Sequence, residues 1–230
     1  MRKWEELPME MQTEDVRYYY DILCKKTTSL ALKRVFDVVV SAIMLIIFSP
    51  VFLILAIAIK IDSPGPVFYR QERVTTYGKR FRIHKFRTMF NNADKKGSLV
   101  TVKNDSRVTK VGSLIRKCRL DEVGQLIDVL LGDMTFVGTR PEVVKYVERY
   151  TPDMMATLLL PAGVTSEASI FYKDEDKLLD GVDNVDHVYV EQVLPGKMKY
   201  NLRSIEKFSF WGDIATMFKT VFAVLGKDSE

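Results

Sequence analysis

Residues 35–59 read VFDVVVSAIMLIIFSPVFLILAIAI, an apolar stretch interrupted near its middle by Ser49-Pro50. As a helix it would be ~38 Å long at ~1.5 Å per residue, enough to cross the ~30 Å hydrocarbon core of a bilayer. Proline lacks a backbone N–H and its ring clashes with the carbonyl four residues earlier, so the helix must kink or stop at Pro50. Ser49 can hydrogen-bond to the preceding turn and ease the bend. The stretch predicts a membrane element with a break.

Basic residues lie on both sides of this stretch. Lys33 and Arg34 precede it and Lys60 follows it. Short flanking loops rich in Lys and Arg stay on the cytoplasmic side of a membrane, so both ends of the element are expected on that side. We therefore predict a re-entrant membrane helix, helix-break-helix, over residues 31–61. A straight transmembrane helix kinked by proline is the alternative.

The rest of the chain fits one globular domain. Of the 230 residues 47% are hydrophobic, and one membrane element leaves room for a domain of ~150 residues. The N-terminus has no apolar core followed by a small-residue cleavage site, so a secretory signal peptide is not expected. We expect a mainly α fold with a small β-hairpin. Residues 1–30 would form a polar extension without an assigned role and residues 31–61 the membrane helix. Residues 62–226 would form a cytoplasmic domain with amphipathic interfacial helices, followed by a tail at 227–230.

The sequence has few residues from which a zinc site or a Ser-His-Asp triad could be built. Cys24 and Cys118 lie far apart and outside any paired metal-ligand spacing, which fits a reducing compartment. His84 and His187 are equally isolated. Both kinds of site are therefore disfavoured.

Positive charge is concentrated directly after the apolar stretch. Residues 60–119 hold sixteen Lys and Arg against four acids, whereas the whole chain carries a formal net charge of only +4. Such a field suits lipid headgroups, phosphates or nucleic acid, and a solvated basic face is the alternative. Because a nucleic-acid reader gains nothing from an adjacent membrane segment, no nucleic-acid partner is expected.

Local patterns predict the remaining elements. The runs VFYRQERV and RFRIHKF, at 67–74 and 80–86, flank a turn at Gly78 and predict a hairpin with a basic face. Pro141 is expected to open a helix. A further amphipathic helix is expected to pack through a stripe at three- and four-residue spacing, formed by Leu120, Val123, Ile127 and Leu130. A C-terminal stripe suits either the membrane interface or, as the favoured choice, packing on the domain; it comprises Trp211, Ile214, Phe218, Val221 and Leu225.

We expect the chemistry to lie in the segment RKCRLDE at 116–122. Two adjacent carboxylates, Asp121 and Glu122, follow three cations at an expected helix start, where the macrodipole favours the ionised form. An ionised carboxylate can attack phosphorus or hold Mg²⁺. Neighbouring helical residues point ~100° apart, so the two carboxylates are not expected to share one task. On spacing alone, an acidic capping turn is the structural alternative.

The wider pattern resembles a known family. The chain contains, in order, KRVFDVVVSAIMLIIFSP, DSPGPVFYRQERV, KFRTM, RLDEVGQLIDVLLGDMTFVGTRPE and KFSFWGDIATMFKTV. Together these closely resemble the bacterial sugar transferases that are monotopic polyprenyl-phosphate phosphoglycosyl transferases. The resemblance covers roughly residues 31–226.

The resemblance implies a reaction and a location. A sugar 1-phosphate would move from a UDP-sugar to a polyprenyl phosphate, such as undecaprenyl phosphate, with Mg²⁺ as cofactor and release of UMP. The domain at 62–226 would be catalytic and would face the cytoplasm from the bacterial inner membrane, at the first membrane step of a glycan pathway such as exopolysaccharide or glycoconjugate synthesis. The oligomeric state, a homodimer included, stays open.

The resemblance also assigns roles to individual residues. Asp121 would be the nucleophile and a metal ligand, with Glu122 as its essential partner. The break of the re-entrant helix would fall on Ser49 and Pro50. Phosphate binding is implied for Arg116 and Arg140, and more weakly for Lys85 and Arg87 on the basic hairpin.

Departures from the family pattern concern the donor sugar. The segment PAGVTSEASIFY at 161–172 replaces the usual sequence, so we predict that its polar groups choose the sugar, with a purely structural loop as the alternative. Thr139 and Asn201 also differ from the usual residues. Two other functions stay open: a lipid-linked glycosyltransferase that releases UDP, and a non-catalytic scaffold that binds anionic lipid.

Overall fold

The computed structural model describes residues 1–91, 93, 105–173, 175–178 and 184–226, so the predicted tail at 227–230 lies outside the described residues. The helices are α1 (Glu14–Cys24), α2 (Thr27–Asp62), α3 (Lys110–Lys117), α4 (Gln125–Leu131), α5 (Val144–Val147), α6 (Glu167–Phe171), α7 (Glu175–Leu178), α8 (Val185–Val188), α9 (Leu194–Glu206) and α10 (Phe210–Leu225). Short 3-10 turns cover Trp4–Glu6, Met9–Met11, Thr76–Gly78, Leu120–Glu122 and Met154–Leu159, and a π-helical turn covers Tyr189–Val193. The strands are β1 (Phe68–Tyr69), β2 (Glu72–Val74), β3 (Arg80–Arg82), β4 (Lys85–Phe86), β5 (Met134–Val137) and β6 (Ala162–Thr165). The mainly helical prediction is confirmed.

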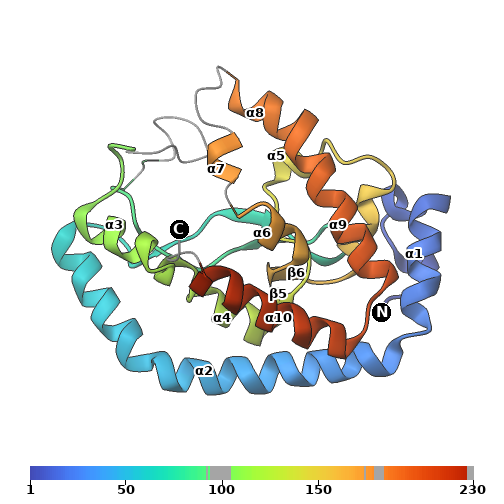
Figure 1. The fold of residues 1–230 in the computed structure, drawn as a ribbon, viewed down its shortest axis with the longest axis horizontal. Helices are drawn as coiled ribbons and strands as arrows, with labels where there is room; N and C mark the ends of the chain where they lie inside the picture. The colour runs from blue at the N-terminus through green and yellow to red at the C-terminus, as the bar shows by residue number, and fades with distance from the viewer. Residues whose placement is uncertain (92, 94–104, 174, 179–183, 227–230) are drawn as a thin grey trace.

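Helix α2 carries the apolar stretch and continues through Pro50 for 36 residues. Figure 1 shows it along one edge of the molecule, bending toward its C-terminal end. Ser49 Oγ donates a hydrogen bond to the Ile46 carbonyl at 2.8 Å, as expected for a serine that eases a proline bend. The predicted helix-break-helix over 31–61 is therefore corrected to one bent helix, which also begins earlier, at Thr27.

The N-terminal half of α2 is fixed to the domain by buried polar groups. Lys33 forms an ion pair with Asp213 of α10. Asp37 accepts hydrogen bonds from the Thr135 hydroxyl at 2.6 Å and from the Phe136 N–H at 3.2 Å, both in β5. A buried charge is costly unless it is paired, so these contacts set the position of the helix on the domain.

The C-terminal half of α2 packs through apolar side chains. Leu55 and Ile59 belong to a buried cluster with Phe86 of β4 and Ile115 of α3. Both ends of the helix thus contact the same domain. Its opposite face is exposed and apolar, and comprises Leu32, Val35, Val39, Ile43, Ile46, Ile47, Leu53, Ile54, Ile57 and Ile61.

The predicted hairpin is present in two pieces. β2 pairs with β3 and β1 pairs with β4, both antiparallel, and Gly78 lies in the connecting turn with φ +74°. Phe81 and Ile83 are buried, whereas Arg80 and Arg82 are exposed, which confirms the basic face. A parallel pair that the sequence did not predict joins β5 to β6.

The predicted helix packed by Leu120, Val123, Ile127 and Leu130 is wrong. Arg119 adopts a left-handed conformation with φ +54°, so the chain turns between α3 and α4 and Leu120 falls in a separate 3-10 turn. The buried face of α4 is offset from the predicted stripe, and consists of Gln125, Leu126, Asp128 and Val129. The helix expected to open at Pro141 is also shorter than predicted and begins at Val144.

The N-terminal extension is part of the core. Met11, Val16 and Leu23 are fully buried, in one cluster with residues of the 154–159 turn and of α9. The extension, which had no predicted role, therefore stabilises the C-terminal half of the domain.

Helix α10 leaves three residues of its predicted stripe exposed. Trp211 is 77% exposed, Phe218 63% and Val221 52%, whereas Ile214 is partly buried, so the favoured prediction that the stripe packs on the domain is wrong for these three residues. Helix α10 lies beside α2 in Figure 1, and Phe210 contacts Phe36 at a ring distance of 5.8 Å. The exposed aromatic side chains suit the membrane interface, the other choice that the sequence left open.

Candidate active site

The turn between α3 and α4 presents the two adjacent carboxylates. A left-handed non-glycine residue is uncommon, and here Arg119 redirects the chain so that Asp121 and Glu122 form a one-turn segment of their own. The two side chains then enter different surroundings. As expected from their spacing, they do not share one environment.

Glu122 lies between two cations. Its carboxylate contacts Lys85 Nζ at 3.0 Å and forms a close ion pair with Arg140. Burial favours the neutral acid, but Arg140 and Lys85 outweigh it and hold the pKa of Glu122 well below its ordinary value. Glu122 is therefore ionised, and its negative charge is neutralised by Lys85 and Arg140.

Asp121 faces a cavity. Burial raises the pKa of the Asp121 carboxyl, and the Glu122 carboxylate raises it further, while Lys85 and Arg116 oppose the shift. A carboxylate whose pKa is raised is the more basic of the pair and the better nucleophile. The structure thus distinguishes the two acids, Asp121 at the cavity and Glu122 bound to Lys85 and Arg140.

The cavity has a volume of about 400 Å³ and a strongly basic lining. Its cationic residues are Arg70, Arg73, Lys85, Arg87, Arg107 and Arg116. Its aromatic residues are Phe68, Tyr69, Phe86 and Phe90. Among the described residues that line it, Asp121 is the only acid. Planar guanidinium groups bind phosphate oxygens in pairs, so the cavity suits a polyanionic ligand with an apolar or aromatic part.

The predicted site residues lie in different places. Arg116 lines the cavity from the last turn of α3. Lys85 also lines the cavity. Arg140 is not among the lining residues and contacts the site through its ion pair with Glu122. Ser49 and Pro50 lie in α2 and are not among the residues lining the cavity. The described structure therefore brings together Asp121, Glu122, Lys85, Arg116 and Arg140.

Arg87 has a structural role that the sequence did not reveal. Its guanidinium donates to the carbonyls of Ser63 at 2.7 Å and Pro64 at 2.9 Å, directly after α2. It also lies 3.4 Å from the Ile59 carbonyl. Arg87 therefore joins the end of the apolar helix to the cavity wall, while phosphate binding by Arg87 stays a prediction.

The segment predicted to choose the sugar lies elsewhere. No residue of 161–172 that the structure describes lines the cavity with Asp121. Ser166 and Glu167 line a separate cavity of about 150 Å³ beside α9 and α10. Phe171 stacks on Tyr200 of α9 at a ring distance of 4.5 Å. The structure favours the alternative, that this segment packs the domain.

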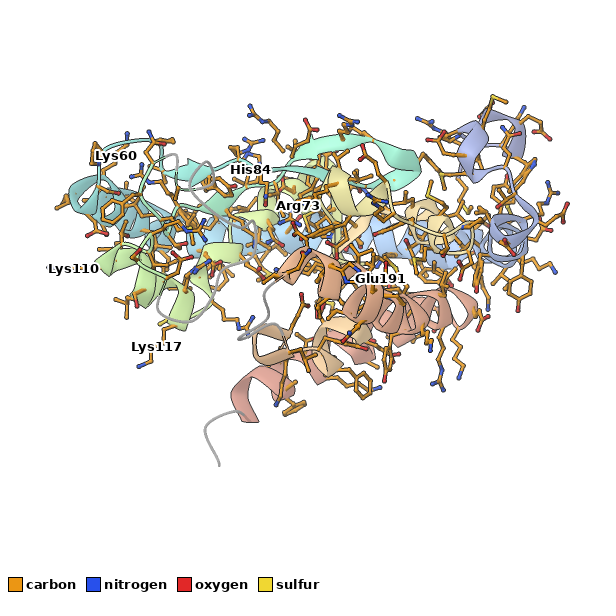
Figure 2. All side chains as sticks on the ribbon, turned by 90° about the horizontal axis from the view of Figure 1, so that it is seen from above. Lys60, Arg73, His84, Lys110, Lys117 and Glu191 are labelled. Atoms are coloured by element: carbon orange, nitrogen blue, oxygen red, sulfur yellow. The ribbon has the colours of Figure 1, made fainter. Side chains whose placement is uncertain are left out.

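Sequence reasoning missed three arginines in the cavity wall: Arg70, Arg73 and Arg107. The charge count over 60–119 was the available signal, but it could not tell wall residues from solvent-facing ones such as Arg80. Figure 2 shows Lys60, Lys110 and Lys117 at one end of the molecule, with Arg73 and His84 nearer its centre. The basic segment is thus spread over several surfaces.

Asp121 alone supplies too few ligands for Mg²⁺, so the others would come from substrate phosphates and water. Across the described residues, no group of three His, Cys, Asp or Glu side chains is placed to hold a metal. Mg²⁺ is commonly bound by one or two carboxylates together with substrate phosphates and water. Asp121 could supply that carboxylate, because Glu122 is occupied by cations.

Comparison with known proteins gives consistent matches. The family model described as bacterial sugar transferase matches residues 28–227. The chain is 34% identical over 197 residues to the UDP-N-acetylgalactosamine-undecaprenyl-phosphate N-acetylgalactosaminephosphotransferase of Aeromonas hydrophila, covering 84% of this chain and 44% of the relative. It is 35% identical over 195 residues to the UDP-glucose:undecaprenyl-phosphate glucose-1-phosphate transferase of Escherichia coli K12, covering 83% and 39%.

A third relative has a different sugar in its name. The undecaprenyl-phosphate galactose phosphotransferase of Salmonella typhimurium LT2 is 35% identical over 218 residues, covering 88% of this chain and 42% of the relative. The chain spans about two fifths of the length of these curated relatives. Because relatives at 34% to 35% identity are named for three sugars, overall identity does not select one.

Proposed function

Because the chain belongs to the bacterial sugar transferase family, we propose that it transfers a sugar 1-phosphate from a UDP-sugar to undecaprenyl phosphate. The observation that carries this proposal is the cavity in which Asp121 lies among six cationic side chains. A diphosphate donor and a phosphate acceptor are both anionic, and such a wall attracts both. The names of the relatives support the same substrates.

The reaction is a double displacement. An Asp121 carboxylate oxygen attacks the phosphorus that carries the sugar, the bond from that phosphorus to the UMP oxygen breaks, and UMP leaves with the electron pair. A phosphate oxygen of undecaprenyl phosphate then attacks the same phosphorus and breaks the acyl-phosphate bond. Asp121 returns as a carboxylate and the product is an undecaprenyl diphosphate sugar.

The neighbouring residues support these displacements. Arg116 and Lys85 lie near Asp121 and would bind phosphate oxygens as negative charge develops. Glu122 holds Lys85 and Arg140 in place through its ion pairs, so its contribution is positioning of cations. Mg²⁺ held by Asp121 and substrate phosphates would neutralise diphosphate charge.

The contacts of α2 support a proposal for the membrane arrangement. A helix of this length and apolarity, with mean hydropathy 3.0 in its most apolar window, is able to cross a bilayer. Both of its ends contact one domain, however, so a crossing would separate groups that are packed together, such as Lys33 with Asp213 and Ile59 with Phe86. The proposal is a monotopic protein of the inner membrane, with the free face of α2 in lipid and the catalytic domain in the cytoplasm.

The proposed function is tested with the full chain in nanodiscs containing undecaprenyl phosphate and Mg²⁺. A panel of UDP-sugars is supplied, and UMP and UDP are separated by chromatography. We expect UMP with at least one donor and loss of UMP release on chelation, restored by Mg²⁺. UDP release instead would indicate sugar transfer without phosphate. Asp121→Asn should abolish release, whereas the matched change Asp21→Asn, at an exposed position on α1, should not.

A further inference from the structure

His84 connects the cavity wall to the helix that follows the acid pair. It lies between β3 and β4, and it is held by Asp128 of α4 through both carboxylate oxygens. The backbone N–H of His84 donates to Asp128 at 2.8 Å, and the ring Nδ1 lies 2.6 Å from the other oxygen. Asp128 is only 1% exposed, so it is committed to this one partner.

The other ring nitrogen identifies the tautomer. His84 Nε2 lies 2.5 Å from Nη1 of Arg70. A guanidinium can only donate, so Nε2 must be the acceptor and the proton must be on Nδ1, where it is donated to Asp128. The chain of contacts therefore runs from a buried carboxylate through a neutral imidazole to an arginine.

Arg70 is held in a defined orientation at the cavity. Its Nε and Nη2 donate to the Arg82 carbonyl at 3.1 and 2.7 Å, while the side chain lines the cavity that contains Asp121. These contacts and the bond to His84 use three of the five N–H donors of a guanidinium. Donors therefore remain for an anion in the cavity.

The same contacts tie Arg70 to the acid pair. Gly124, two residues after Glu122, packs so closely on His84 that an added Cβ would lie 2.8 Å from the His84 carbonyl oxygen. Lys85, the next residue after His84, contacts Glu122. His84, which lies just before β4, thus packs on the start of α4, while Lys85 of β4 contacts the acid pair.

We propose that Arg70 binds a phosphate of the UDP-sugar donor and that His84 and Asp128 are positioning residues that hold its guanidinium toward the cavity. This inference rests on the proposed function, because it names a further donor-binding residue for that reaction. Asp128 is not among the described residues that line the cavity, so it acts on a bound ligand through His84 and Arg70.

The test is a double-mutant cycle on donor kinetics with the full chain in nanodiscs. Arg70→Ala should raise the donor KM about tenfold or more, as for the loss of a hydrogen bond to a charged group, and change kcat less. Asp128→Asn should raise KM in the same direction, because an amide cannot accept both His84 hydrogen bonds. The double variant should be no worse than Arg70→Ala alone, since both changes remove one interaction. Arg80→Ala is the matched control, an exposed arginine of β3 paired with Glu72.

Three outcomes decide between the explanations. An unchanged donor KM in Arg70→Ala, with a normal wild-type rate, overturns the inference and leaves the proposed function intact. Effects of Arg70→Ala and Asp128→Asn that multiply in the double variant would show that Asp128 only supports the fold, and would also overturn it. If neither the wild type nor Arg80→Ala transfers any donor sugar, the proposed function itself is overturned.

Discussion

The cavity wall and the free face of α2 lie on one chain but are built in opposite ways. The wall gathers six cations, and two of the acids beside it are held by partners, Glu122 by Lys85 and Asp128 by the His84 ring. The free face of α2 is an exposed row of Val, Leu and Ile that no described residue covers. Arg87 joins the two, since it lines the cavity and binds the carbonyls that follow α2. The proposed donor site therefore depends on paired and hydrogen-bonded polar groups, whereas the proposed lipid-facing surface needs only apolar area.

The largest effect is expected from breaking the paired charges. Glu122→Gln leaves Lys85 and Arg140 without their shared anion, so both cations should move or bind substrate unproductively. We expect kcat/KM to fall about a hundredfold or more, since breaking a partly buried pair commonly costs ~3 kcal/mol. The measurement is UMP release. Glu72→Gln removes an exposed partner of Arg80 and should stay near the wild-type rate. An active Glu122→Gln enzyme would show that the charge pairing is dispensable.

A second prediction concerns the free face. Single cysteines at the exposed positions Lys26 and Lys60, which flank the free face of α2, in a background without Cys24 and Cys118, are tested in intact cells with a reagent that stays outside. Because both ends of α2 pack on one domain, we expect labelling at each to be about tenfold below that of permeabilised cells. Pro50→Leu removes the proline bend and should shift a fraction of the chains toward crossing. Strong external labelling at one position in the unaltered helix would contradict the proposed topology.

The smallest effect is expected from a region outside both surfaces. Residues 161–172 pack on α9 and α10 and do not line the cavity. Exchanging them for the sequence of a relative with a known donor should change the ratio of kcat/KM between two UDP-sugars by less than about twofold, or ~0.4 kcal/mol. A shift of tenfold or more would return sugar choice to this segment.

The sequence predicted some parts of this structure because they are local. The apolar stretch, the turn at Gly78 and the separation of Asp121 from Glu122 depend on neighbouring residues, and the structure agrees with each. The helix stripe at Leu120–Leu130 failed because Leu120 lies in a 3-10 turn separate from α4 and the buried face of α4 is offset from the predicted positions, and periodicity alone does not reveal such a turn.

Other features depend on contacts between distant residues. Asp128 and His84 are 44 positions apart, and Arg87 contacts Ser63 at the end of α2 across 24 positions. Neither contact has a sequence spacing that would reveal it. The buried N-terminal residues Met11 and Leu23 were hidden for the same reason, since their partners lie in the 154–159 turn and α9.

The most direct test of the central claim is to look for the covalent adduct on Asp121. The full chain is mixed with a UDP-sugar accepted by the enzyme, without undecaprenyl phosphate, quenched in acid and analysed by peptide mass spectrometry. Double displacement predicts a peptide containing Asp121 that is heavier by the mass of a sugar phosphate less water, absent from Asp121→Asn and lost on adding undecaprenyl phosphate. An unmodified Asp121 peptide under conditions that release UMP, with two-substrate kinetics that give intersecting lines, would rule out double displacement and assign the reaction to direct transfer in a ternary complex.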